Sequence, residues 1–269
     1  MNQSERRLFL IRSLLKEDAR YRETAVPADA DGQRQLLRAL MNVRPPRAAD
    51  AAFLSVQDEY LRTEIAGKGI TDVNDLMPVQ PGICLWQGDI TTLRCDAIVN
   101  AANSGMTGCY VPNHRCIDNA IHTFAGVELR LACAKLMAKQ GCPGPTGQAK
   151  ITPAFDLPCR YVLHTVGPIV DGRVTRRDRE LLVSCYRACL ELAAENGLES
   201  VAFCCISTGE FRFPNEQAAQ IAVAAVKEFL KQQTSVRKVI FDVFKEEDRA
   251  IYARLLGADR TAEGRTAGL

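Results

Sequence analysis

The segment Val201-Ala202-Phe203-Cys204-Cys205-Ile206 is a continuous apolar run, followed by the polar stretch Ser207-Thr208-Gly209-Glu210 and by a helical pattern that begins at Asn215. Uninterrupted apolar strands are typical of parallel sheets that helices cover on both faces. The run therefore predicts a central strand of an α/β fold, and the polar stretch predicts a loop at its carboxyl end. Ligands of open α/β sheets bind in the crevice beyond those ends.

Short apolar segments alternate with longer amphipathic segments from residue 82 to about residue 258, which predicts a three-layer α/β fold. The other predicted strands are Ile83–Gln87, Ala97–Val99, Tyr161–Val166 and Val239–Val243. The predicted helices are Asp118–Lys139, Arg177–Asn196, Asn215–Lys231 and Lys245–Leu256. We expect residues 79–258 to form the main domain. Residues 259–269 are small and polar, and we expect them to form a disordered tail.

Residues 1–78 differ from the rest of the chain in pattern. A first helix is predicted around Leu8, Ile11 and Leu14, which fall on one helical face, and two more are predicted at Gln33–Val43 and Ala48–Ala66. The stretch carries no chemical motif. Because short helices are marginally stable alone, we expect this N-terminal helical extension to pack on the main domain.

Composition narrows the class of protein. The chain has 269 residues, of which 47% are hydrophobic, enough for a large core. Its net charge of +2 gives no reason to expect nucleic-acid binding, and no apolar run approaches the roughly 20 residues that span a membrane. The N-terminus does not read as a signal peptide. Eleven cysteines, several in apolar runs, indicate small buried residues in a reducing, cytoplasmic environment.

Two thiols and an imidazole lie close together in Cys109-Tyr110-Val111-Pro112-Asn113-His114-Arg115-Cys116. Cysteine and histidine are the preferred ligands of zinc. Three ligands predict one Zn²⁺ ion at Cys109, His114 and Cys116, with a position left open for water or substrate. The alternatives are a closed site that takes Cys142 as its fourth ligand, and a chance grouping in a cysteine-rich chain. The other two histidines are interpreted as core residues.

Three polar loops that follow strands are candidate ligand-binding segments. In Gln87–Thr91 a carboxylate could hold the polar edge of a ligand, and in Asn100–Ser104 two amides could face sugar hydroxyls. Ser207–Pro214 offers backbone N–H groups to a diphosphate ahead of a helix. Each loop also has an ordinary interpretation as a turn or a helix cap. We expect all three to converge on one crevice.

These segments resemble the macrodomain family, whose members bind ADP-ribose conjugates and often hydrolyse them. The matching segments, in the family's order, are Gln87–Thr91, Asp96–Ser104, Ile117–His122, Thr146–Thr152, Tyr161–Pro168 and Ile206–Gly209. The resemblance implies an α/β fold, a three-layer α/β/α macrodomain with a mixed central sheet, here joined to an N-terminal helical extension.

The resemblance also implies roles for individual residues. Asp89 and the backbone of Ile90 match adenine contacts. Asn103 matches the asparagine beside the distal ribose, and Asp118 matches the catalytic aspartate of the hydrolytic members. The remaining implied ADP-ribose contacts are Ser207, Thr208, Gly209, Glu210, Phe211 and, as an adenine-stacking ring, Phe244.

The Cys109–Cys116 segment stands where most hydrolytic members have a short run of glycines. In this it resembles the zinc-containing, sirtuin-linked branch, whose members also carry a helical N-terminal extension. The resemblance implies a zinc-dependent hydrolase that removes mono-ADP-ribose from modified proteins, with a lipoyl carrier protein modified by a sirtuin-type transferase as a candidate substrate. An ADP-ribose reader without catalysis and a zinc-stabilised scaffold are the alternatives. The sequence leaves open which side chain carries the modification, and whether zinc or Asp118 activates the nucleophile.

Overall fold

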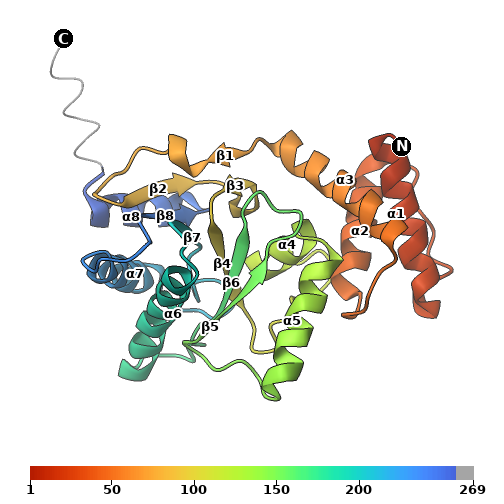
Figure 1. The fold of residues 1–269 in the computed structure, drawn as a ribbon. Coiled ribbons are helices and arrows are strands. Elements are labelled where there is room, and N and C mark those ends of the chain that lie inside the picture. Colours follow the sequence, from red (N-terminus) through yellow and green to blue (C-terminus); the bar gives the residue numbers. More distant parts are fainter. Residues whose placement is uncertain (259–269) are drawn as a thin grey trace, which may run out of the picture.

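The computed structural model describes residues 1–258 and is built around a six-stranded sheet (Figure 1). The strand order is β2-β8-β7-β4-β6-β5. Neighbouring strands run parallel except β5, which is antiparallel to β6, so the predicted mixed sheet is confirmed. The strands are β2 (Ile83–Gln87), β4 (Ala97–Ala102), β5 (Ala149–Pro153), β6 (Tyr161–Val166), β7 (Ser200–Phe203) and β8 (Lys238–Val243). A separate two-stranded sheet joins β1 (Thr71–Asp72) to β3 (Leu93–Arg94).

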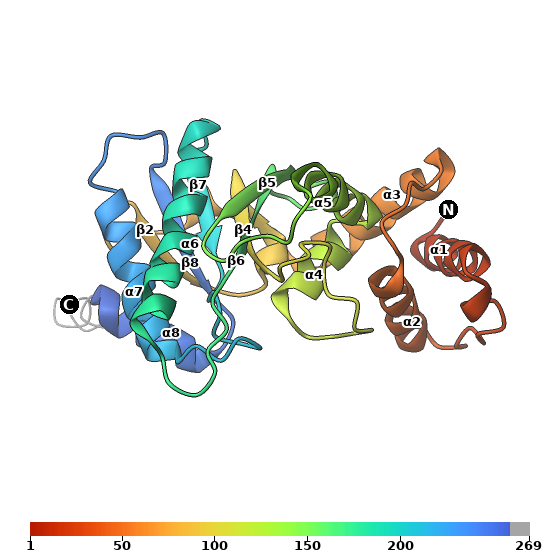
Figure 2. The same cartoon turned by 90° about the horizontal axis from the view of Figure 1, so that it is seen from below.

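Helices complete the three layers. Figures 1 and 2 show α6, α7 and α8 on one side of the sheet and α4 and α5 on the other. The bounds are α4 (Ile117–Phe124), α5 (Val127–Gln140), α6 (Arg176–Glu195), α7 (Asn215–Phe229) and α8 (Glu246–Leu256). The central strands are buried on both faces, as the apolar run at Val201 predicts. None of the helices within residues 1–258 is both long enough and apolar enough to cross a membrane.

Several predicted boundaries are wrong, and the strand expected at Ala97–Val99, for example, continues to Ala102. The single helix expected at Asp118–Lys139 is two helices, because Gly126 breaks it with a φ of 85°, a conformation that favours glycine. The strand expected at Val201–Ile206 ends at Phe203. Strand β5 has no counterpart among the predicted strands. The predicted disordered tail, residues 259–269, lies outside the described residues.

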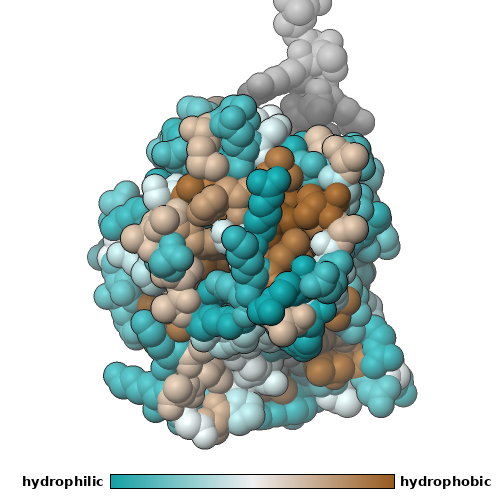
Figure 3. Space-filling view, turned by 90° about the vertical axis from the view of Figure 1, so that its right-hand side faces the viewer, coloured by the Kyte–Doolittle hydropathy of each residue, from teal (hydrophilic) through white to brown (hydrophobic). Residues whose placement is uncertain are grey.

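The N-terminal extension consists of three helices, α1 (Gln3–Glu17), α2 (Ala30–Val43) and α3 (Ala51–Lys68). Asn2, Asp29 and Asp50 cap their N-termini by accepting backbone N–H groups. The helices share a small core that also contains Val127 of α5, so the extension packs directly on the main domain. Figure 3, which looks at this side of the molecule, shows apolar surface between hydrophilic side chains.

Candidate active site

Loops at the carboxyl ends of the strands meet at one edge of the sheet. The Cys109–Cys116 loop lies beside the loop after β7, where His114 Nε2 is 3.5 Å from Glu210 Oε1. The loop after β2 lies beside the end of β8, where Gln87 Nε2 donates to the carbonyl of Phe244 at 3.5 Å. The predicted site residues therefore line a common edge, although they come from separate parts of the chain.

Asp118 lies in the first turn of α4 and is buried, with both carboxylate oxygens held by asparagine amides. Asn100 Nδ2 on β4 donates to Oδ1 at 2.8 Å, and Asn103 Nδ2 donates to Oδ2 at 3.2 Å. Burial raises the pKa of Asp118 to about 6, against the opposing effect of the Asn100 hydrogen bond. The structure thus brings together Asn103 and Asp118, the two residues predicted to be catalytic.

Asn100, one of the two amides expected to face sugar hydroxyls, is instead fully buried, and its side chain supports Asp118. Its amide nitrogen also lies 3.2 Å from His164 Nδ1. Because an amide nitrogen only donates, His164 Nδ1 accepts, and the Nε2–H of His164 donates to Thr152 Oγ1 at 2.9 Å. Burial lowers the pKa of His164 to about 4, so the ring is neutral at pH 7. His164 is therefore a hydrogen-bonded core residue, as predicted.

His122 lies one helical turn after Asp118, with Nε2 3.6 Å from Asp118 Oδ1. Within residues 1–258 neither ring nitrogen of His122 has a hydrogen-bond partner, although the ring is buried. Burial holds the pKa of His122 well below its usual range, so it too is neutral. The ring lines a small pocket between α2 and α5 together with Met41 and Arg130.

Two clusters of side chains within residues 1–258 could hold a metal ion. One is the predicted set Cys109, His114 and Cys116, whose donor atoms lie within 4.8 Å of one another. Cys109 Sγ is 3.6 Å from His114 Nδ1. Zn–S and Zn–N bonds of usual length at the tetrahedral angle put sulfur and nitrogen about 3.6 Å apart, so this donor pair fits zinc. Exposed Cys142 is not in the cluster.

The second cluster consists of His122, Cys133 and His164, all buried. Its chemistry suits a metal less well. Both ring nitrogens of His164 already face Asn100 and Thr152, so a metal there would have to displace one of these hydrogen bonds. The thiols do not separate the two clusters, because burial raises the pKa of Cys133 and that of Cys116 alike to about 12.

The loop after β7 has the features of an anion site. Ser207 and Arg212 take positive φ angles of 66° and 58°, and Phe213 N donates back to Ser207 O at 2.9 Å. This turn leaves the backbone N–H groups of Gly209, Glu210 and Phe211 with no acceptor among the described residues. Successive free N–H groups in a turn form a concave site for phosphate oxygens.

Asp89 lies just after β2. Its Oδ1 accepts from Thr91 N and Thr91 Oγ1, while its Oδ2 pairs with Lys68 Nζ at 2.8 Å. Lys68 comes from the last turn of α3 and lies 3.2 Å from the centre of the Phe124 ring. Ile90 is buried beside Asp89, and the Phe244 ring is 78% exposed. Sequence reasoning missed Lys68, since no local pattern links it to Asp89.

Comparison with known proteins agrees with this geometry. The model of the Macro domain family matches residues 99–222. A "Protein-ADP-ribose hydrolase" from Treponema medium is 57% identical to this chain over 95% of its length and 100% of the relative's. The chain belongs to the macrodomain family. A "Protein-ADP-ribose hydrolase" from Staphylococcus aureus is 44% identical to this macrodomain protein, and the alignment covers 93% of this chain and 95% of the relative.

Solved structures support the same assignment. The Trypanosoma brucei macrodomain in complex with ADP-ribose superposes on this macrodomain with a TM-score of 0.64 at 31% identity, over 81% of this chain and 94% of that one. A variant of the Oceanobacillus iheyensis macrodomain with ADPR gives a TM-score of 0.61 at 37% identity, over 68% and 96%. The predicted macrodomain fold is therefore confirmed.

Proposed function

We propose that this macrodomain protein is a zinc-dependent hydrolase that removes mono-ADP-ribose from modified proteins. The observation that carries the proposal is the position of Asp118, held by two asparagine amides and two residues beyond Cys116 of the three-donor cluster. The names of the relatives at 57% and 44% identity support the activity. The donor geometry at Cys109 and His114 supports the metal.

The loops around the crevice suit the parts of ADP-ribose in order. Asp89 can accept the adenine amine through Oδ2 when Lys68 moves aside, and the exposed Phe244 ring can stack on the base. The free N–H groups of the loop after β7 receive the diphosphate, with Ser207, Thr208, Gly209, Glu210 and Phe211 as its contacts. Binding energy from the nucleotide then fixes the distal ribose near Asn103 and Asp118.

The reaction cleaves the bond between the anomeric carbon of the distal ribose and the modified side chain. Positive charge develops on the ribose as that bond breaks, and a water oxygen forms the new bond to the anomeric carbon. The modified side chain leaves with the electron pair of the broken bond, and Asp118 accepts the proton of the attacking water. Asn100 and Asn103 hold the Asp118 carboxylate in place. Cys109, His114 and Cys116 would hold a zinc ion, which would supply Lewis acidity toward a ribose hydroxyl or a water.

The substrate is an ADP-ribosylated protein, and the resemblance to the sirtuin-linked branch favours a lipoyl carrier protein as the modified partner. The Cys109–Cys116 loop, called the metal loop below, exposes Tyr110 and Val111. These side chains lie where the modified protein would approach the site. They provide apolar contacts for a protein surface, which free ADP-ribose does not need.

The test is release of ADP-ribose from a mono-ADP-ribosylated protein, measured together with calorimetric binding of ADP-ribose. We expect Asp118→Asn and Cys116→Ser to lose turnover and to keep most of the affinity for ADP-ribose. Cys142→Ser is the matched control, because this thiol is exposed and lies outside the cluster. Binding without turnover in the unsubstituted protein would make it a reader. Full turnover in Asp118→Asn would remove the proposed base.

A further inference from the structure

We propose that helix α2 of the N-terminal extension is a working part of the active site, because its side chains hold the Cys109–Cys116 loop in the conformation that gathers the three metal donors. This inference rests on the proposed zinc-dependent function. It assigns Arg38 and Asn42 as positioning residues, which touch the metal loop and not the substrate.

Arg38 forms one half of this support. Its Nη2 donates to the carbonyl of His114 at 3.0 Å, and Nε and Nη2 both donate to Asn119 Oδ1, at 3.2 and 2.9 Å. Asn119 in turn donates from Nδ2 to the carbonyl of Val111 at 3.1 Å. The Arg38 guanidinium therefore holds the backbone of the loop at His114 directly and at Val111 through Asn119.

Asn42, one turn further along α2, forms the other half. Its Oδ1 accepts the backbone N–H of Asn113 at 3.0 Å, and its Nδ2 donates to Thr123 Oγ1 on α4 at 3.0 Å. Asn113 takes a φ of 55°, which is unusual for a residue other than glycine. The side chain of Asn42 is buried, so this hydrogen bond is shielded from water. Asn42 thus stabilises a turn that points His114 toward Cys109.

The loop has few contacts within itself. Tyr110, Val111 and Asn113 are exposed, and the one backbone hydrogen bond inside the loop among the described residues runs from His114 N to Val111 O at 3.2 Å. A loop this exposed samples many conformations unless contacts from outside restrict it. The α2 contacts supply that restriction from a part of the chain more than 70 positions away.

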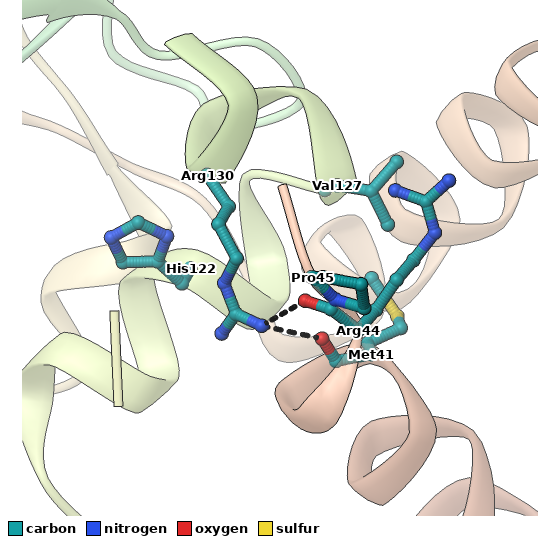
Figure 4. A pocket seen from close by; sticks show the side chains of 7 residues that line it. Met41, Arg44, Pro45, His122, Val127 and Arg130 are labelled. Carbon is teal, nitrogen blue, oxygen red and sulfur yellow. Dashed lines mark hydrogen bonds between the residues drawn. The ribbon is translucent and has the colours of Figure 1, made fainter. Parts of the chain in front are cut away.

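Helix α2 can serve as a support because the main domain anchors it. Arg130 of α5 reaches across the interface, and its Nη1 donates to the carbonyls of Asn42 and Arg44 at 2.6 Å each, and to that of Met41 at 3.3 Å. Figure 4 shows Arg130 extended toward this end of α2, beside His122. The guanidinium also lies over the Tyr110 ring at 4.2 Å. One buried cation thus contacts both α2 and the Cys109–Cys116 loop.

The experiment compares metal affinity in Arg38→Ala, Asn42→Ala and a control, Arg34→Ala. Arg34 lies on the same helix but is exposed, and within residues 1–258 its ion pair is with Asp31 of that helix. Affinity for Zn²⁺ is measured by competition with a chromophoric chelator, and Co²⁺ is added to metal-free protein to record the thiolate-to-cobalt charge-transfer band. Calorimetric binding of ADP-ribose reports that each variant is folded.

We expect Arg38→Ala and Asn42→Ala each to weaken Zn²⁺ binding by about 10- to 100-fold, the range for residues that orient metal ligands. The cobalt band should change shape and kcat should fall more than KM changes, while Arg38→Lys should recover part of the affinity. Arg34→Ala should match the unsubstituted protein. If Asn42→Ala does not fold, Arg38→Ala decides.

Two results would overturn the inference and are distinguishable. Zn²⁺ affinity and cobalt spectra of Arg38→Ala equal to those of the unsubstituted protein would show that α2 does not position the loop, while leaving the proposed function intact. Failure of the unsubstituted protein to bind either cation would remove the proposed zinc dependence, and the inference with it.

Discussion

Replacing Arg130 by methionine should separate the extension from the main domain at a defined energetic cost. Methionine keeps much of the apolar volume but removes the donor to the carbonyls of Asn42 and Arg44. A hydrogen bond to a charged group contributes about 1.5–3 kcal/mol, so the two short bonds give about 3–6 kcal/mol. The substitution also removes the free-energy cost of burying a cation, and this offsets part of the loss. We expect a net loss of about 3 kcal/mol in the free energy of unfolding.

The assay for Arg130→Met is urea unfolding of the full chain, with stability taken from the linear extrapolation. The matched control is Arg187→Met on α6, whose exposed side chain pairs with Glu191, which is also exposed; this substitution should change stability by less than about 0.5 kcal/mol. Arg130→Met should also lower turnover, since the Tyr110 contact is lost. A stability equal to that of the unsubstituted protein would refute the reasoning that Arg130 anchors α2.

Contacts elsewhere in the molecule lead to three more expected outcomes. Gly108→Ala should cost about 2 kcal/mol or more, because φ is 85° and the new Cβ would lie 2.8 Å from His122 Cγ; Gly141→Ala, with a φ of 74° and open space around it, should lose less in the same urea assay. Asn100→Ala should lower kcat for ADP-ribose release more than it changes ADP-ribose affinity, since it frees one oxygen of Asp118; equal kcat would contradict this. Burial, reinforced by Asp58, raises the pKa of Asp156 to about 7. The protonated carboxyl therefore contributes fully to the free energy of unfolding below about pH 4, and this contribution is lost as the pH rises toward 7, because the buried carboxyl then ionises. Asp156→Asn should therefore stabilise the protein by about 2 kcal/mol at pH 8, after allowance for solvent screening at exposed Arg62, and by less at pH 5, as thermal unfolding at the two pH values would show.

The sequence predicts those parts of the fold that have a local signal. Apolar strands such as the one at Val201 and the amphipathic helices of the extension are visible as patterns, and they occur in the structure with shifted ends. The break at Gly126 escapes sequence reasoning because one glycine inside a helical pattern is compatible with a continuous helix. Strand β5 escapes it because Ala149–Pro153 is short and mixed in polarity.

The candidate site also contains some features that have a local signal in the sequence and others that do not. The donors between Cys109 and Cys116 are close along the chain, so the spacing of residue types alone predicts that they group. The contacts of Lys68 with Asp89, and of Arg38 with His114, join residues that no periodicity relates. These tertiary contacts depend on how the extension docks, which is decided by burial at Val127 and by the Arg130 hydrogen bonds rather than by any local preference.

The most direct test of the account is the zinc content of the purified full chain, measured alongside release of ADP-ribose from mono-ADP-ribosylated protein before and after removal of the metal. We expect one zinc per chain, loss of turnover in the metal-free protein, and recovery when zinc is returned. A variant lacking Cys109 and Cys116 should hold no zinc and should not recover. Full turnover by the metal-free protein would contradict the claim that the Cys109–Cys116 loop is a catalytic metal site.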